Sequence, residues 1–104
     1  MKRDIAVDLT AEQRAIALQI LHDHLPADTS VWVFGTRARG QARPYSDLDL
    51  AIDAGRRLSM AGTSDLAEAF SESDLPWKVD VVDWRALEPR FASLIEAELV
   101  PLSK

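Results

Sequence analysis

The sequence predicts an α+β fold in which a small mixed β-sheet is flanked by helices. Segments with apolar residues at helical spacing alternate along the chain with short apolar segments rich in β-branched residues. Hydrophobic residues make up 47% of the chain and charged residues 28%, a balance typical of globular proteins. A length of 104 residues suits one domain, so we expect residues 1–104 to form a single domain.

Three helices are expected. The first covers residues 10–24, because Thr10 and Gln13 fit a capping box, which satisfies free backbone N–H groups at a helix start. A second helix is expected over residues 64–71, where apolar residues recur at helical spacing. A third is expected over residues 89–99. It begins with a proline, which suits the first turn because its missing N–H costs nothing there.

Three strands are expected between these helices, over residues 30–34, 46–53 and 77–83. In the second strand polar and apolar residues alternate strictly. One face carries Asp47, Asp49, Ala51 and Asp53, and the other carries Leu48, Leu50 and Ile52. This period of two predicts a half-buried strand, with one face in the core. The short polar segment of residues 36–41 is compatible with a single helical turn.

The composition excludes several classes of protein. The chain has no cysteine, which rules out disulfides, thiolate zinc sites and cysteine nucleophiles. Its formal net charge of −5 disfavours the phosphate contacts that dominate nucleic-acid affinity, so we expect no direct binding of nucleic acid. No apolar run approaches the ~18–20 residues of a membrane helix, and Asp4 and Asp8 interrupt any signal peptide. We therefore expect a cytoplasmic protein that does not contact a membrane.

Three aspartates are the strongest candidates for a chemical role. Asp47 and Asp49 lie on one face of the second expected strand, about 6.6 Å apart along the backbone. Two like charges placed in this way repel each other and are tolerable if a divalent cation lies between them. Oxygen ligands without Cys or His favour a hard ion, Mg²⁺ or Mn²⁺. Asp80 lies between two valines on the third expected strand, and strands ~4.8 Å apart would let all three carboxylates converge on one metal cluster.

A glycine at the end of the first expected strand suits an anion-binding turn. Gly35 follows that strand directly, and such a turn presents backbone N–H groups to an anion. Thr36 adds a hydroxyl, while Arg37 and Arg39 add charge suited to phosphate. A phosphate-binding turn, two metal-binding carboxylates and a third carboxylate that accepts a proton are the parts needed for phosphoryl or nucleotidyl transfer.

Simpler interpretations of the same residues stay open. Asp47 and Asp49 are also compatible with solvated carboxylates on an exposed strand face. Arg37 and Arg39 are compatible with arginines that are solvated or paired with surface acids. An EF-hand calcium loop is excluded, because it needs polar ligands where this segment has leucine and isoleucine.

Other residues receive structural interpretations. Asp53 and Asp83 suit the capping or solvation of strand ends better than metal binding. Gly35 and Gly40 have the spacing of P-loop glycines, but the lysine and hydroxyl residue that follow them in a P-loop are missing. Trp84 is a candidate for an exposed patch that a partner uses.

The spacing of the glycine and the aspartates resembles that of the minimal nucleotidyltransferases (MNT) of the DNA polymerase beta superfamily. The hallmark of that family is a Gly-Ser pair, ten residues and then Asp-x-Asp, with a later aspartate between apolar residues. Here Gly35 and Thr36 are followed by ten residues and then by Asp47 and Asp49. Asp80 occupies the place of the later aspartate. One departure is Thr36, where the family usually has serine.

The resemblance implies a polymerase beta-like nucleotidyltransferase fold and nucleotidyl transfer, usually from ATP, with Mg²⁺. It also implies that Asp47, Asp49 and Asp80 are the catalytic and metal-binding residues, and that Asp80 activates the acceptor hydroxyl. The nucleotide-binding residues are expected to be Gly35, Thr36, Arg37, Arg39 and Ser46.

The resemblance further implies a partner. MNT proteins are commonly encoded beside a helical HEPN protein, an RNase toxin to which the MNT antitoxin can transfer AMP on a tyrosine. We therefore expect a hetero-oligomer with a HEPN-type toxin, and transfer of AMP from ATP to a hydroxyl of that toxin. In a rival hypothesis the domain is a binding module that neutralises its partner by occlusion, with catalysis weak or lost. The intact set of three aspartates favours the enzyme.

Overall fold

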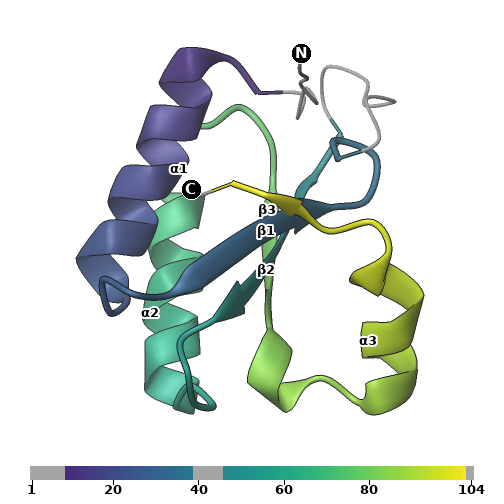
Figure 1. Ribbon diagram of the computed structural model, residues 1–104. Coiled ribbons are helices and arrows are strands. Elements are labelled where there is room, and N and C mark those ends of the chain that lie inside the picture. Colours follow the sequence, from purple (N-terminus) through teal and green to yellow (C-terminus); the bar gives the residue numbers. More distant parts are fainter. Residues whose placement is uncertain (1–8, 39–45, 103–104) are drawn as a thin grey trace.

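The computed structural model describes residues 9–38 and 46–102 (Figure 1). In this part of the chain, helices and strands alternate in the following order: α1 (Ala11–His24), β1 (Ser30–Phe34), β2 (Leu48–Asp53), α2 (Met60–Ser71), β3 (Val79–Asp83), the 3₁₀-helix η1 (Trp84–Ala86), α3 (Pro89–Glu96) and β4 (Val100–Pro101). The predicted α+β fold with helices flanking a mixed sheet is confirmed. No helix within the described ranges is long and apolar enough to cross a membrane.

The four strands form one sheet in the order β3-β2-β1-β4. Strands β2 and β3 are parallel, because α2 carries the chain back between them, whereas β1 pairs antiparallel with both β2 and β4. Two pairs of this register matter for the site. Asp49 lies opposite Phe34 of β1 on one side and opposite Asp80 of β3 on the other.

Helices cover both faces of the sheet (Figure 1). Helices α1 and α2 pack side by side on one face, where they bury the larger hydrophobic cluster, which contains Leu48, Leu50 and Ile52. A smaller cluster around Phe34, Ala51 and Ile95 lies on the other face, beneath α3. The prediction of a half-buried β2 is therefore wrong at its centre, because Ala51 is 0% exposed. The two ends of this face, at Asp49 and at Asp53, stay partly open.

The helix starts follow their capping residues. The predicted capping box of α1 is confirmed, since Gln13 N–H donates to Thr10 Oγ1 and Thr10 N–H donates to Gln13 Oε1, both at 3.0 Å. Helix α2 begins at Met60, four residues before the predicted start. Its N-cap is Ser59, whose hydroxyl accepts from the N–H of Gly62 at 3.0 Å. Glycine and threonine in the first turn have low helix propensity, which hid this start in the sequence.

The remaining boundaries also differ from the predictions. Strands β2 and β3 each begin two residues later than expected, so Asp47 precedes β2 instead of lying within it. Helix α3 ends at Glu96, not at residue 99, and the chain then turns into β4, which was not predicted. A strand of two residues that includes a proline has no sequence pattern of its own, but it is acceptable at a sheet edge.

Candidate active site

Strand register brings the candidate catalytic aspartates to one end of the sheet. Asp49 and Asp80 are direct partners on parallel neighbouring strands, so their side chains leave the same face of the sheet. Asp47 lies two residues before Asp49, just ahead of β2, and is exposed. Asp49 and Asp80 are 31 positions apart in the sequence, and the βαβ connection through α2 brings their carboxylates next to each other.

Among the residues that the structure describes, no basic side chain forms an ion pair with Asp49. Partial burial raises the pKa of the Asp49 carboxyl group above its ordinary value, and the negative charges of Asp80 and Asp47 raise it further. Both neighbouring aspartates are therefore within electrostatic reach of Asp49. A bound cation would remove this penalty, which is the behaviour expected of a site that needs a metal ion.

The side chains themselves are not gathered into a finished metal site. Within residues 9–38 and 46–102, no three or more His, Asp or Glu side chains are arranged so that they could hold a metal ion. Asp80 Oδ1 lies 3.6 Å from Lys78 Nζ, and its side chain is 45% exposed. The backbone register thus pairs Asp49 with Asp80, but the expected convergence of the three side chains, Asp47 included, is not present. Their chemistry, carboxylate oxygens alone, still fits a hard divalent cation such as Mg²⁺.

The turn after β1 lies directly against Asp49. Gly35 has a φ of +79°, and Ala38 N–H donates to its carbonyl oxygen at 3.1 Å, which closes a turn that contains Thr36. A Cβ atom on Gly35 would collide with Oδ2 of Asp49. Only glycine therefore permits both the backbone conformation and this close approach. The predicted phosphate-binding turn and the predicted metal-binding carboxylate are neighbours in the structure.

Arg37 is buried in the same turn. The residue is 5% exposed, and its Nε and Nη2 atoms donate to the carbonyl oxygen of Ser46 at 3.1 and 2.9 Å. Its guanidinium carbon lies 4.2 Å from the centre of the Trp77 ring. Arg37 is therefore not a solvated arginine. That Arg37 and Ser46 bind the nucleotide stays a prediction, and Arg39 lies outside the described residues.

Glu98 is a site residue that the sequence analysis missed. The N–H of Gly35 donates to Glu98 Oε1 at 3.2 Å, so the carboxylate reaches the turn from the C-terminal part of the chain. The sequence placed Glu98 inside a helix, whereas the chain turns there and directs it back to β1. The available signal was weak: an acidic residue is unfavourable near a helix C-terminus, which argues for an earlier helix end.

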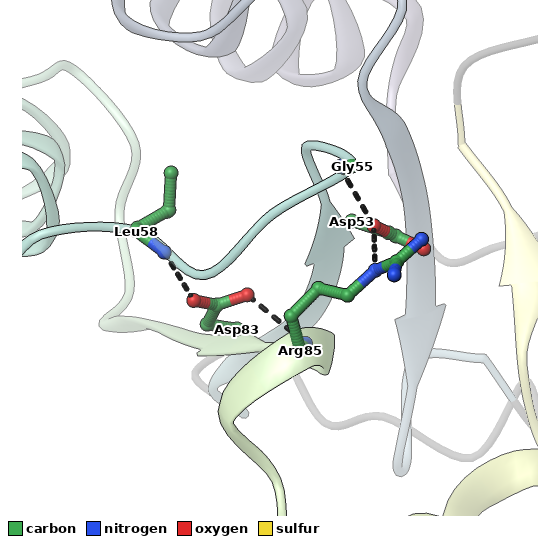
Figure 2. A network of polar contacts seen from close by, with 5 residues as sticks. All are labelled: Asp53, Gly55, Leu58, Asp83 and Arg85. Atoms are coloured by element: carbon green, nitrogen blue, oxygen red, sulfur yellow. Dashed lines mark hydrogen bonds and ion pairs between the residues drawn. The ribbon is translucent and has the colours of Figure 1, made fainter.

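The opposite end of the sheet holds a network of compensated charges (Figure 2). Asp53 Oδ1 accepts from Arg85 Nε and from the N–H of Gly55, both at 2.8 Å, and the hydrogen bond from Arg85 lowers the pKa of the Asp53 carboxyl group. Asp83 accepts from the N–H of Leu58 at 2.7 Å and from the N–H of Arg85 at 3.1 Å. The interpretation of Asp53 and Asp83 as capping residues is confirmed.

Trp84 does not form the exposed patch that was considered for it. Its ring centre lies 6.0 Å from that of Trp32, and both side chains pack against the smaller hydrophobic cluster. The two rings are therefore partly buried as part of the packing on this face of the sheet.

Comparison with known proteins identifies the family. Residues 17–102 match the family described as polymerase beta, nucleotidyltransferase. The chain belongs to this nucleotidyltransferase family. The resemblance drawn from the glycine and aspartate spacing is confirmed. The chain is also 43% identical over 98 residues to the "Probable protein adenylyltransferase MntA" of Haemophilus influenzae, covering 94% of this chain and 85% of that protein.

Solved structures show the same fold. A crystal structure of a toxin–antitoxin complex with AMP-PNP contains a chain that matches with a TM-score of 0.75 and 24% identity, over 86% of this chain and 72% of that one. The structure of a tri-AMPylated HEPN toxin with its MNT antitoxin, from Shewanella oneidensis, matches with a TM-score of 0.65 and 22% identity, over 86% and 68% of the two chains. At these identities the likeness establishes the fold and not the activity.

Proposed function

We propose that this nucleotidyltransferase transfers AMP from ATP to a hydroxyl group of a partner protein, and that it is the antitoxin of a HEPN-type RNase toxin. The observation that carries the proposal is the contact of the Gly35 turn with Asp49, whose strand partner is Asp80. The relative named a protein adenylyltransferase and the toxin–antitoxin complexes of similar fold support the choice of acceptor. The protein would act as one domain, residues 1–104, in the cytoplasm, where ATP is present.

Each part of the site has a task in this reaction. Asp47, Asp49 and Asp80 would hold Mg²⁺, which supplies neutralisation of the triphosphate charge when bound. The turn would bind phosphate oxygens through the backbone N–H and the hydroxyl of Thr36, because the N–H of Gly35 already donates to Glu98. The acceptor oxygen bonds to the α-phosphorus, the bond from that phosphorus to pyrophosphate breaks, and the hydroxyl proton passes to a carboxylate oxygen of Asp80.

The exposure of the carboxylates suits this role. Asp47 and Asp80 are solvent-accessible, so their side chains are free to rotate toward Asp49 when a cation binds. The ion pair of Asp80 with Lys78 is exposed on both sides, and such pairs are worth only about 0–1 kcal/mol, too little to prevent the rotation.

The test is transfer of label from ATP labelled at the α-phosphate to the protein product of the neighbouring reading frame, which the proposal expects to be a HEPN-type toxin. Wild type is compared with Asp49→Asn and with the matched control Asp53→Asn, which changes the same residue type at the other end of the same strand. We expect label on the partner with wild type and Asp53→Asn, and none with Asp49→Asn. A stable complex that stays unlabelled with wild type would support the rival hypothesis of neutralisation by occlusion.

A further inference from the structure

We propose that Arg37 is a positioning residue that does not contact the nucleotide. It would hold Ser46, which precedes Asp47, and Trp77, which lies shortly before Asp80, against the Gly35 turn. The inference rests on the proposed function, because it assigns a task to one residue of that site. It replaces the role in phosphate binding that the sequence suggested for Arg37.

The first contact joins the turn to the segment before β2. Two nitrogen atoms of the Arg37 guanidinium donate to one acceptor, the carbonyl oxygen of Ser46, at 3.1 and 2.9 Å. Hydrogen bonds from a charged donor are about twice as strong as neutral ones. Ser46 directly precedes Asp47, so these bonds fix the peptide from which the exposed carboxylate projects.

The second contact joins the same side chain to the segment before β3. The guanidinium lies over the ring of Trp77, 4.2 Å from its centre, which is within the range of a cation–π interaction. Trp77 is 8% exposed and belongs to the larger hydrophobic cluster, so its ring is a fixed surface. It lies three residues before Asp80. Between them, the backbone carbonyl oxygen of Lys78 accepts a hydrogen bond from the N–H of Leu48 at 2.9 Å.

Burial explains why this arginine is unsuited to binding a phosphate group. A charged side chain is costly to bury unless its donors are satisfied, and here the protein supplies a carbonyl oxygen and an aromatic face. Moving the guanidinium toward a phosphate would break both contacts. The planar guanidinium group can donate two hydrogen bonds to one carbonyl oxygen and stack on a ring at the same time. Lysine replaces it poorly, because its ammonium group is a point charge.

The test measures metal binding separately from catalysis. Arg37→Lys, Trp77→Leu and Trp77→Phe are titrated with Mn²⁺ alone by electron paramagnetic resonance, and AMP transfer is measured over a range of ATP concentrations. Residues that orient metal ligands typically change metal affinity 10–100-fold, so we expect Arg37→Lys to weaken Mn²⁺ binding about 10-fold. Its kcat should fall while its KM for ATP stays within about twofold of the wild-type value. Trp77→Leu should also weaken Mn²⁺ binding and lower kcat. Trp77→Phe, which keeps an aromatic face, should have Mn²⁺ affinity and kcat close to those of wild type.

Arg14→Lys is the matched control. Arg14 Nη1 also donates to a backbone carbonyl, that of Leu102, at 2.7 Å, but this bond joins α1 to the C-terminal end of the described chain. The control should lower the melting temperature without changing Mn²⁺ affinity. The proposal is overturned if Arg37→Lys raises the KM for ATP about tenfold with unchanged Mn²⁺ binding, or if it only lowers the melting temperature as the control does. Because the Mn²⁺ titration needs no partner, it decides the role of Arg37 even if wild type transfers no AMP.

Discussion

Two aspartates on the same face of β2 are expected to respond in opposite ways to loss of their charge. The folded protein raises the pKa of Asp49, so its ionised form weakens stability. This weakening begins as the pH rises above the unfolded pKa and is complete once the pH has passed the raised folded pKa. The folded protein lowers the pKa of Asp53, so its ionised form adds stability above the unfolded pKa, and that stability is lost on acidification. At pH 7, without metal, Asp49→Asn should therefore stabilise the protein and Asp53→Asn should destabilise it.

The magnitude follows from the surroundings of Asp49. Partial burial is the largest cause of its raised pKa, and the charges of Asp80 and Asp47 come next. Both neighbours are solvent-accessible, so each repulsion is reduced by screening to about 0–1 kcal/mol. Removing one charge should thus gain about 1 kcal/mol. For a domain of this size that corresponds to a rise in melting temperature of roughly 4–8 °C. Asparagine has the shape of aspartate, so the contact with Gly35 is kept.

Thermal denaturation at low salt, at pH 7 and again at a pH where Asp49 is protonated, measures this difference. The stabilisation by Asp49→Asn should vanish at the acidic pH. Added Mg²⁺ should raise the melting temperature of wild type but not of Asp49→Asn, because a ligand stabilises only the state that binds it. A fall in melting temperature for Asp49→Asn at pH 7 would refute the view that this end of the sheet carries uncompensated charge.

Substitutions at three further residues test contacts around the site and away from it. Gly35→Ala should abolish AMP transfer and cost about 1–2 kcal/mol from the positive φ alone, with more from the collision with Asp49, and a melting temperature like that of wild type would contradict this. Glu98→Ala should lower the free energy of unfolding by about 1 kcal/mol and reduce transfer by loosening the Gly35 turn, whereas Glu98→Gln, which keeps an acceptor for the Gly35 N–H, should lose less of both. Asp83→Ala should cost about 1–3 kcal/mol by leaving the N–H of Leu58 without its acceptor, and any specific loss of transfer beyond that instability would speak against its purely structural role.

The fold was predictable where a local pattern determined it. The capping box of α1 and the β-branched residues of β1 were correctly interpreted because their signals lie within a few residues of each other. Strand β4 was missed because a two-residue strand exists only through its pairing with β1. The burial of Ala51 was missed for a related reason. An alternating pattern shows which face is apolar, but a small residue on the other face does not reveal that α3 covers it.

The candidate site was predictable in its chemistry but not in its supporting contacts. The spacing of Gly35, Asp47 and Asp49 is a sequence property, and the register of β2 with β3 brings Asp80 alongside them as expected. The contacts of Glu98 with Gly35 and of Arg37 with Ser46 join segments whose relative position depends on turns and helix ends. Such contacts have no signature in the sequence, because the residues that make them are ordinary charged residues.

The two ends of the face of β2 that carries the aspartates show what a nucleotidyltransferase site requires. At one end Arg85 neutralises Asp53, and the result is a structural network with no remaining demand for a cation. If an arginine were placed beside Asp49 in the same way, the pKa of Asp49 would fall and the apo protein would gain stability. Metal binding would then be weaker, because the repulsion that a bound cation relieves would already be absent. The unfavourable charge at Asp49 is therefore best understood as a requirement of the site, and a stabilised variant obtained by neutralising it should be inactive.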